Sequence, residues 1–264
     1  MGPPAGQDKD FPYWLIILAG IGAYLFYEVL SDQVYADVLT KLSKGIRITV
    51  LVAVVAYVSA CLIGLGLAVA LRSRNIVLRQ SARFYVEVMR GVPIIVLLLY
   101  VAFVFAPGAV LALNWLTGWL GIEPIRPRDF TLLWRAVIAL TLAYSAFLAE
   151  VFRAGLQAVD KGQIEAADAL GLSRWRTFRH VVFPQAFRII LPPLGNDFVA
   201  MVKDSSLVSV LGVTDVTQLG KVIAAGNFRY FETYNVVALI YLTMTVTLSL
   251  VLRRIEARLR QRHG

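Results

Sequence analysis

Six apolar stretches constrain the fold of this chain more than any other feature. An α-helix rises roughly 1.5 Å per residue, so about 20 residues cross a hydrocarbon layer about 30 Å thick. Hydrophobic residues make up 58% of the 264 residues, and charged residues make up 16%. We therefore predict an all-α integral membrane protein with about six transmembrane helices. The expected spans are 11–30, 46–71, 84–106, 131–156, 187–211 and 233–252.

The segments between the spans carry expectations of their own. Residues 1–10 are polar and rich in Gly and Pro, which predicts a disordered lead. Residues 31–45 place apolar side chains on one face of a helix lying at the membrane interface. Residues 107–130 hold a short apolar piece between prolines and are also expected at the interface, and 212–232 should connect the last two spans outside the membrane. The chain thus divides into the lead 1–10, an extra N-terminal helix with its interfacial segment 11–45, a membrane domain 46–255 and a basic tail 256–264.

Residues 160–184, which we call the docking loop, form a polar island between two apolar spans. Gly171 can end a short helix in the left-handed conformation, and Ser173 can cap the next one. Two short helices joined by a turn are therefore expected, with Pro184 marking the end of the second. The loop contains Glu165-Ala166-Ala167, then Gly171, then Val181-Val182-Phe183-Pro184.

This pattern resembles the cytoplasmic EAA loop of ABC importer permeases, in which Glu-Ala-Ala is followed at fixed spacing by Gly and by Ile-x-Leu-Pro. The spacing is intact here, and the Ile and Leu positions carry conservative replacements. The resemblance implies the five-helix core of a type I importer with one additional N-terminal helix, and a coupling helix that meets an ATPase. The residues it implicates in coupling are Gly162, Gln163, Glu165, Ala166, Ala167, Leu170, Gly171 and Arg174.

Basic residues are distributed unequally between the two sides of the expected spans. Seventeen of the 26 Lys and Arg residues fall on the docking-loop side and eight on the other, with Lys203 inside the membrane. The positive-inside rule then places the docking loop and both termini in the cytoplasm. A cleavable signal peptide is the alternative for 11–30, but Lys9 is the only basic residue before it and no small-x-small cleavage site follows.

Span 187–211 brings charge to membrane depth. A charged side chain at mid-bilayer costs about 2.5–3.5 kcal/mol on insertion scales, so Asp197, Lys203 and Asp204 should face a cavity or one another. On a helix Asp197 and Asp204 share one face, and Asn196 and Lys203 share a neighbouring face. This mixed-charge stripe suits a zwitterion. A permanent internal ion pair involving Lys203 and Asp204 remains the alternative.

Two other spans add polar groups. Span 131–156 contributes Tyr144, and it places Glu150 and Arg153 three residues apart on one helix face near the docking loop. A carboxylate at that depth needs either this arginine or a polar cavity. Arg90 lies at the entry of span 84–106, beside a Gly/Pro interruption at Gly91–Pro93, and an anchoring role at the interface is its alternative.

Several segments resemble the polar amino-acid subfamily of these permeases. They are Arg90-Gly91-Val92-Pro93, Ala143-Tyr144 through Glu150-Val151-Phe152-Arg153, Lys161-Gly162-Gln163, Pro184-Gln185-Ala186 and Lys203-Asp204-Ser205-Ser206-Leu207. The sequence departs from that pattern at Val92, at Ser205 and in the longer Tyr144-to-Glu150 spacing. The resemblance covers about residues 40–255. The substrate-site candidates are Asp204, Lys203, Ser205, Asn196, Asp197, Glu150, Tyr144 and Arg90.

The resemblance also implies an assembly in the bacterial inner membrane. The expected partners are two ATP-binding subunits, a second permease subunit of the same or a homologous chain, a periplasmic substrate-binding protein, the lipid bilayer and a small amino-acid substrate. The chain has no phosphate-binding loop, so no cofactor is expected in it, and ATP and Mg would reside on the ATPase subunits. Its basic residues lie at span ends without interleaved aromatics, so no nucleic-acid partner is expected.

Three alternatives use the same sequence differently. A permease for quaternary amines would need an aromatic cage in place of the Lys203 and Asp204 stripe. An ion-coupled secondary amino-acid transporter could use the interrupted span and its carboxylates, but it would have no need of the docking loop. An intramembrane enzyme lacks a set of catalytic groups, because His180 and His263 both lie in polar stretches outside the spans, and neither suggests a metal site.

Overall fold

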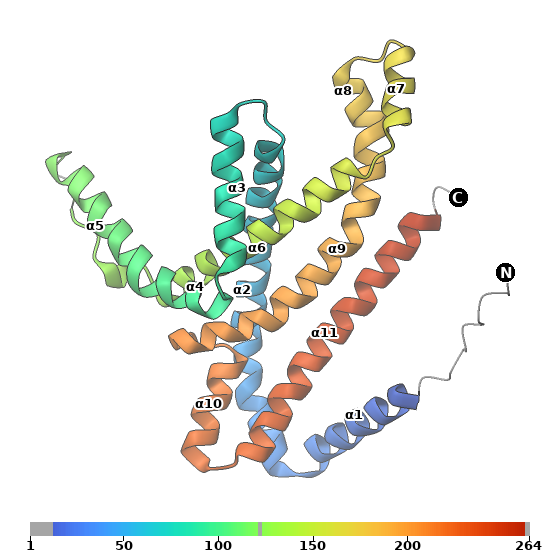
Figure 1. Cartoon of the computed structure of the whole chain (residues 1–264). Coiled ribbons are helices and arrows are strands. Elements are labelled where there is room, and N and C mark those ends of the chain that lie inside the picture. The colour runs from blue at the N-terminus through green and yellow to red at the C-terminus, as the bar shows by residue number, and fades with distance from the viewer. Residues whose placement is uncertain (1–12, 121–122, 262–264) are drawn as a thin grey trace.

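A computed structural model describes residues 13–120 and 123–261, and the predicted disordered lead 1–10 lies outside the described residues. Helices follow one another along the described chain, which contains no strand, as the all-α prediction requires (Figure 1). In chain order the elements are α1 Tyr13–Ser31, α2 Gln33–Leu71, α3 Ile76–Gly91, α4 Ile94–Tyr100, η1 Val101–Phe105, α5 Ala106–Thr117, η2 Gly118–Leu120, η3 Pro127–Asp129, α6 Leu132–Gln157, α7 Lys161–Ala169, α8 Arg174–Thr177, η4 Phe178–Val182, α9 Phe183–Asp204, η5 Ser205–Leu211, α10 Val216–Asn227 and α11 Tyr230–Gln261.

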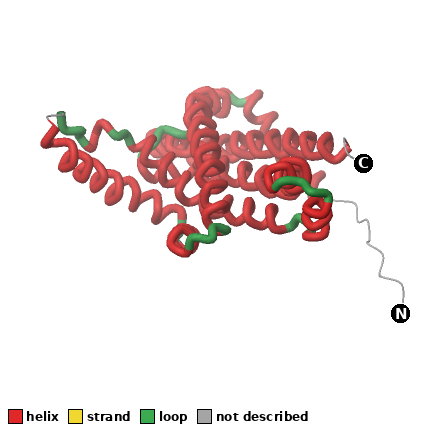
Figure 2. Tube along the Cα trace, turned by 90° about the horizontal axis from the view of Figure 1, so that it is seen from above, coloured by secondary structure: helices red, strands yellow, loops and turns green. Residues whose placement is uncertain are grey.

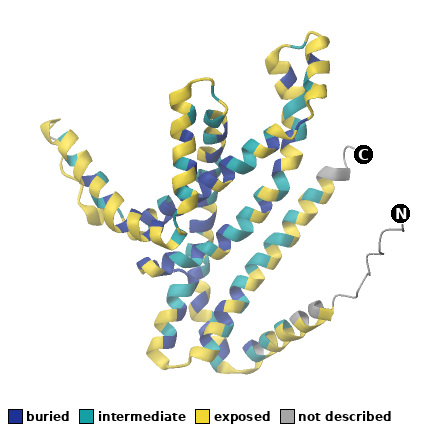
Figure 3. Ribbon diagram, in the orientation of Figure 1, coloured by how far each residue is buried: buried dark blue, intermediate teal, exposed yellow. Residues whose placement is uncertain are grey.

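Helices α2 and α6 form the centre of the molecule, where burial is greatest (Figure 3). Alanines and a glycine let the two backbones approach closely, as small residues do between helices in membranes. A Cβ on Gly64 of α2 would lie 3.0 Å from Leu148 Cβ of α6. Alanine positions of both helices that are fully buried include Ala53, Ala56, Ala60, Ala136 and Ala139. The prediction of a span at 131–156 is confirmed by α6.

Helix α2 has 39 residues and is about 58 Å long, longer than a bilayer core is thick. It begins at Asp32, whose side chain accepts a hydrogen bond from Val34 N at 2.7 Å. Residues 33–45, expected as an interfacial helix, are therefore the first part of α2, and their depth relative to the membrane stays a prediction. The apolar face expected there is real, but it packs on α10 and α11, with Val38 and Leu42 buried. The pattern predicted the right face and the wrong neighbour.

The third expected span begins and ends later than the sequence suggested. Helix α3 ends at Gly91, Val92 and Pro93 break the chain, and one apolar helical stretch then runs from Ile94 to Leu120. The span at 84–106 and the interfacial placement of 107–130 are thus both wrong in their bounds. Seen from above, this stretch projects away from the other helices (Figure 2).

A π-turn explains how this helix passes its proline. In η1 the bonds run to the fifth residue back, so Ala106 N donates to Val101 O. The next carbonyl, that of Ala102, would face Pro107, which has no N–H. Arg135 of α6 takes the vacant position, because its Nη1 donates to Ala102 O at 2.7 Å. Its other two nitrogens donate to the carbonyls of Phe130 and Pro127, so each nitrogen of the buried guanidinium makes a hydrogen bond.

The docking loop joins α9 through a second π-turn of the same kind. Phe183 N donates to Phe178 O across η4, so the following carbonyl, that of Arg179, would face Pro184. The expectation that Pro184 ends a helix is wrong, since the helical path continues into α9. Helix α9 also runs unbroken through Pro192 and Pro193. Prolines are tolerated in this way in membrane helices, where neighbouring groups satisfy the freed backbone.

The break in the fifth span lies beyond Pro192 and Pro193, after α9 has ended at Asp204. A 3₁₀ segment, η5, follows this residue, and the chain bends by 50° before α10. Residues 212–232, expected as a connection, contain α10, which packs on α2 and α11. Asp215 caps α10 and is fully buried: Gln218 N, Thr217 N and the Tyr241 hydroxyl donate to its carboxylate at 2.8, 3.2 and 3.0 Å.

Four helices of the described residues are long and apolar enough to cross a membrane, or five if the bent pair of α9 and α10 counts as one span. The expected span 11–30 corresponds to α1, which is not among them, so the count of six stays a prediction. Helices α7 and α8 lie at the same end of the molecule as the junction of α2 and α3, and α10 lies at the opposite end (Figure 1).

Candidate functional site

The docking loop folds into two short helices, as its sequence predicted. Asp160 caps α7, because its Oδ1 accepts a hydrogen bond from Gly162 N at 2.6 Å. At the other end Gly171 adopts φ +75°, the left-handed conformation that glycine enters without strain. Leu172 N then donates to Ala167 O at 3.1 Å and Gly171 N to Asp168 O at 3.0 Å. This is a Schellman motif, which turns the chain sharply into α8.

Seven of the eight expected coupling residues are exposed on this pair of helices, and Ala167 alone is buried. Ala167 therefore holds α7 against its neighbours, whereas the others can reach a partner. Ser173 stands at the start of α8 as expected, but its hydroxyl makes no capping hydrogen bond. Trp175, which the sequence analysis did not select, is 65% exposed and stacks on Phe178 with ring centroids 6.0 Å apart. The exposed residues are Gly162, Gln163, Glu165, Ala166, Leu170, Gly171 and Arg174.

A second group of candidates meets where α9 ends. Tyr144 of α6 is 5% exposed, and its hydroxyl donates to Asp204 Oδ2 at 2.7 Å. Asp197 lies seven residues, about two helical turns, before Asp204 on the same face of α9 and is half-buried. Tyr57 of α2 donates to Leu194 O at 2.6 Å, and its ring lies 4.8 Å from that of Phe198. We call Tyr57, Tyr144, Asp197 and Asp204 the carboxylate cluster.

Arg90 approaches the same face of α6 from the end of α3. Its guanidinium carbon lies 5.8 Å from the centre of the Phe147 ring, and that ring lies 6.3 Å from Tyr144. A cation therefore stands at one end of an aromatic pair and a carboxylate at the other. This order of charge, apolar surface and opposite charge can receive the two charged groups of a zwitterion.

The remaining candidates of α9 are placed differently. Lys203 is exposed, and no carboxylate of the described residues lies within 4.0 Å of its ammonium, so the internal ion pair with Asp204 is not formed. Asn196 is also exposed. Ser205 is fully buried, and its hydroxyl donates to Val202 O at 2.7 Å, which occupies it in ending the helix. Of these three, Lys203 and Asn196 have free polar groups.

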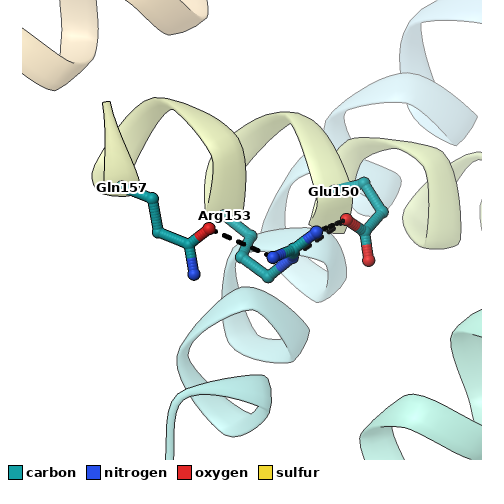
Figure 4. A network of polar contacts seen from close by, with 3 residues as sticks. All are labelled: Glu150, Arg153 and Gln157. Atoms are coloured by element: carbon teal, nitrogen blue, oxygen red, sulfur yellow. Dashed lines mark hydrogen bonds and ion pairs between the residues drawn. The ribbon is translucent and has the colours of Figure 1, made fainter.

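Glu150 does not join the carboxylate cluster. Its Oε2 accepts from Arg153 Nε at 2.9 Å, and Arg153 Nη1 donates to Gln157 Oε1 at 3.1 Å, so three side chains run along one face of α6 (Figure 4). They line a cavity of about 250 Å³ together with residues of α2 and α3. The expected pairing of Glu150 with Arg153 is confirmed, and the structure places it apart from Asp204.

Aromatic residues are what the sequence analysis missed. Tyr57, Phe147 and Phe198 lie within apolar runs, where an aromatic side chain gives no separate signal. Only the motifs that contain Arg90 and Asp204 pointed to the helices that these rings connect. The chance of finding them from sequence alone depended on knowing which faces of α2, α6 and α9 meet.

Comparisons with known proteins support these features. The family model described as "Binding-protein-dependent transport system inner membrane component" matches residues 60–262. The chain is 37% identical over 219 residues to the glutamine transport system permease protein GlnP of Escherichia coli strain K12, covering 83% of this chain and 93% of that protein. It is 34% identical over 212 residues to the probable amino-acid permease protein YxeN of Bacillus subtilis strain 168, covering 80% and 87%.

Solved structures give the same result. A chain from the crystal structure of an amino acid ABC transporter with histidines superposes with a TM-score of 0.70 at 35% identity, covering 87% of this chain and 97% of that one. A chain of the methionine transporter MetNI in an inward-facing conformation gives 0.63 at 20% identity, covering 83% and 96%. The second likeness concerns the fold alone.

Proposed function

Because the chain belongs to the family of binding-protein-dependent transport system inner membrane components, we propose that it is the membrane-spanning subunit of an ABC importer for polar amino acids. It provides the path across the membrane and no ATPase site of its own, since the ATPase of these importers is a separate subunit. The single observation that carries the proposal is the docking loop, because a pair of exposed short helices after the central span serves coupling to a separate motor and has no use in an ion-driven carrier.

The proposed assembly contains a second permease subunit, two ATPase subunits that hold ATP and Mg, and a periplasmic substrate-binding protein. In it, the exposed residues of α7 and α8 contact an ATPase subunit, with Trp175 and Leu170 as apolar anchors. Closure of the ATPase pair moves α7 and α8, and η4 transmits the movement to α9. The carboxylate cluster at the end of α9 is then presented alternately to the two sides.

The proposed substrate site lies between Arg90 and the carboxylate cluster. The substrate ammonium is bound by Asp204 and Asp197, and its carboxylate by Arg90 or Lys203. Among the described residues Asp204 receives one hydrogen bond, from Tyr144, so its oxygens retain capacity for a ligand. Glutamine is the first candidate substrate, because the relative from E. coli is named for glutamine transport.

Uptake by reconstituted protein tests this proposal. The permease and its ATPase subunits are placed in liposomes with the loaded binding protein, and radiolabelled amino acid is followed. We expect uptake that requires ATP in the compartment of the docking loop and that persists when sodium and proton gradients are dissipated. Transport that follows an ion gradient without ATP would establish the secondary transporter instead.

The docking residues give a more specific test of coupling. Gly171→Val should retain the fold but force the Schellman turn open, because a β-branched residue avoids positive φ. ATP hydrolysis should then no longer respond to the loaded binding protein, and uptake should fall at least tenfold. Gly226→Ala is the control, since a Cβ there meets nothing within 4 Å. Full stimulation of hydrolysis in the Gly171→Val complex would contradict the coupling assignment.

One observation favours a second substrate class. The aromatic pairs Tyr57–Phe198 and Tyr144–Phe147 bracket carboxylates, an arrangement that also suits a quaternary amine. Competition separates the two, because a betaine has no N–H to donate to Asp204. Glutamine uptake should be unaffected by excess betaine if the polar amino-acid assignment is correct.

A further inference from the structure

A charged cavity lies between α3 and α6, at the end of α6 that leads into the two docking helices, α7 and α8. Its volume is about 250 Å³, below the roughly 300–1,000 Å³ typical of pockets for drug-sized ligands, so it can hold one small metabolite. The lining residues come from the end of α2, the middle of α3 and the end of α6. They are Leu71 of α2, Arg83, Val86 and Glu87 of α3, and Glu150, Arg153 and Gln157 of α6.

The cavity has a fixed floor. Val86 is 1% exposed and packs against Ala146 and Ala149 of α6. Tyr85 of α3 donates to Leu142 O of α6 at 3.0 Å and lies 2.7 Å from the Ser145 hydroxyl. These contacts set the spacing of α3 and α6 without a ligand, so the two helices that carry the charged side chains are already positioned before anything binds.

Only one of the two possible ion pairs in the cavity is formed. Arg153 is bonded to Glu150 and to Gln157 (Figure 4). Arg83 and Glu87 are four residues apart on α3, a spacing at which opposite charges commonly pair, although an acidic residue first is the more favourable order. Nevertheless neither has an oppositely charged atom within 4.0 Å in the part of the chain that the structure describes. The cavity therefore offers one unpaired cation and one unpaired carboxylate.

We propose that this cavity is a second amino-acid site that recognises the two backbone charges of a free α-amino acid. Glu87 accepts hydrogen bonds from the α-ammonium, and Arg83 donates to the α-carboxylate, while the Glu150–Arg153 pair forms the opposite wall. The site recognises the α-ammonium and α-carboxylate of the ligand rather than its side chain, because the cavity lining has no polar side chains besides Arg83, Glu87 and the bonded Glu150, Arg153 and Gln157. A chloride ion or a simple amine would satisfy only half of the site.

The position of the cavity suggests what such binding does. Gln157 is the last residue of α6, four residues before Lys161 begins α7. A ligand that joins α3 to this end of α6 restrains the stem from which the docking helices project. This part of the argument rests on the proposed function: amino acid accumulating on the docking-loop side would stabilise one state of the transporter and slow further uptake.

Calorimetric titration tests the site directly. The purified permease–ATPase complex carrying Asp204→Asn, without nucleotide or binding protein, is titrated with L-glutamine, so that binding to the carboxylate cluster is weakened. We expect binding with one site per permease chain, at least tenfold weaker when Glu87→Gln or Arg83→Gln is added. Arg74→Gln removes a charge from the loop between α2 and α3, outside the cavity, and should leave the affinity unchanged. Analogues of glutamine that lack the α-ammonium or the α-carboxylate should not bind.

Two results would overturn the proposal. One is an absence of binding in the Asp204→Asn complex, and the other is an affinity that neither Glu87→Gln nor Arg83→Gln alters. Melting temperature and basal ATP hydrolysis are measured on each variant. A variant that shows a folding defect is replaced by the conservative substitution at the same position, Arg83→Lys or Glu87→Asp.

Uptake into preloaded vesicles tests the consequence. Internal L-glutamine should lower the initial rate severalfold relative to empty vesicles, and Glu87→Gln should bring that ratio close to one. An unchanged ratio in the Glu87→Gln variant would refute the inhibitory role. Because the titration does not depend on transport, failure of ATP-driven uptake would refute the proposed function and leave the binding result readable.

Discussion

Two aspartates stand at the two ends of the same short segment, and their surroundings are opposite. Asp215 follows η5, is fully buried, and has three donors within 3.2 Å: two backbone N–H groups of α10 and the Tyr241 hydroxyl. Asp204 precedes η5, is partly exposed, and has one donor, the Tyr144 hydroxyl. No basic side chain lies within 4.0 Å of either carboxylate among the described residues.

The difference separates structure from binding. A buried carboxylate is tolerated when its oxygens accept hydrogen bonds. Both oxygens of Asp215 do so, and these bonds join α10 to α11. Thr49 of α2 accepts from Val216 N at 3.3 Å beside it, which adds a third helix. Asp204 has unused acceptor capacity in a half-buried position, and if this segment crosses the membrane as expected, such capacity is costly to maintain without a ligand or water. The following substitutions test that contrast.

The largest effect is expected at Asp215. In Asp215→Ala three donors lose their acceptor inside the protein, and the helix cap is lost as well, so unfolding should become easier by about 3 kcal/mol. The thermal unfolding midpoint of the purified complex measures this. Asp215→Asn keeps one acceptor oxygen and should lose about half as much. A variant that melts like the wild type would mean that Asp215 is not the structural member of the pair.

Gly45 tests the same junction from the side of α2. A Cβ at this position would lie 2.6 Å from Val216 N and 2.7 Å from Asp215 C, and these backbone atoms cannot rotate away. Gly45→Ala should therefore destabilise the protein by about 2 kcal/mol. Gly66→Ala on the same helix is the matched control, because nothing lies within 4 Å of its Cβ. Equal melting of the two variants would show that α2 and α10 separate readily.

Asp204 should show the reverse behaviour. Asp204→Asn keeps an acceptor for Tyr144 but removes the charge, so stability should change by less than about 0.5 kcal/mol, whereas uptake should fall at least tenfold, about 1.4 kcal/mol. Initial uptake rates per assembled complex, compared with basal ATP hydrolysis, measure the loss. If the variant melts much lower and retains uptake, Asp204 is a structural group like Asp215.

The smallest effects are expected from the two tyrosines. Tyr241→Phe removes one donor from the buried carboxylate and should cost about 1 kcal/mol of stability without altering uptake per folded complex. Tyr144→Phe removes the single donor of Asp204, so it should cost less stability and reduce uptake a fewfold. Melting and uptake recorded for both variants complete the comparison. A pattern with the roles exchanged would undo the distinction.

Part of this fold follows from the sequence because it depends on local signals. Hydrophobic length located α6 and most of α2 and α11, and Gly171 located the end of α7 through its left-handed turn, whereas the sequence analysis did not select the Asp160 cap at its start. The bounds failed where helices continue through a nominal breaker. Pro107 and Pro184 follow π-turns, and Pro192 lies inside α9, so a proline was not sufficient evidence for an end.

The site was predicted in composition and not in arrangement. Tyr144 and Asp204 were both candidates, yet they are 60 positions apart, and nothing local says that their side chains touch. Glu150 and Arg153 could be paired from spacing alone, because three residues on a helix bring side chains together. Phe147 gave no signal, since its contact with Arg90 depends on how α3 approaches α6.

The two π-turns differ in what stiffens them. In η1 the carbonyl left without a helical donor is held by Arg135, which fixes the elbow between α4 and α5 to the central helix. In η4 the corresponding carbonyl of Arg179 receives no side-chain hydrogen bond from the described residues. The first π-turn is therefore the stiffer of the two, and the second can bend more easily. A force applied at Trp175 would therefore rotate the docking helices about η4 before it deforms the central bundle, so the stroke delivered to α9 depends on the compliance of one helical turn.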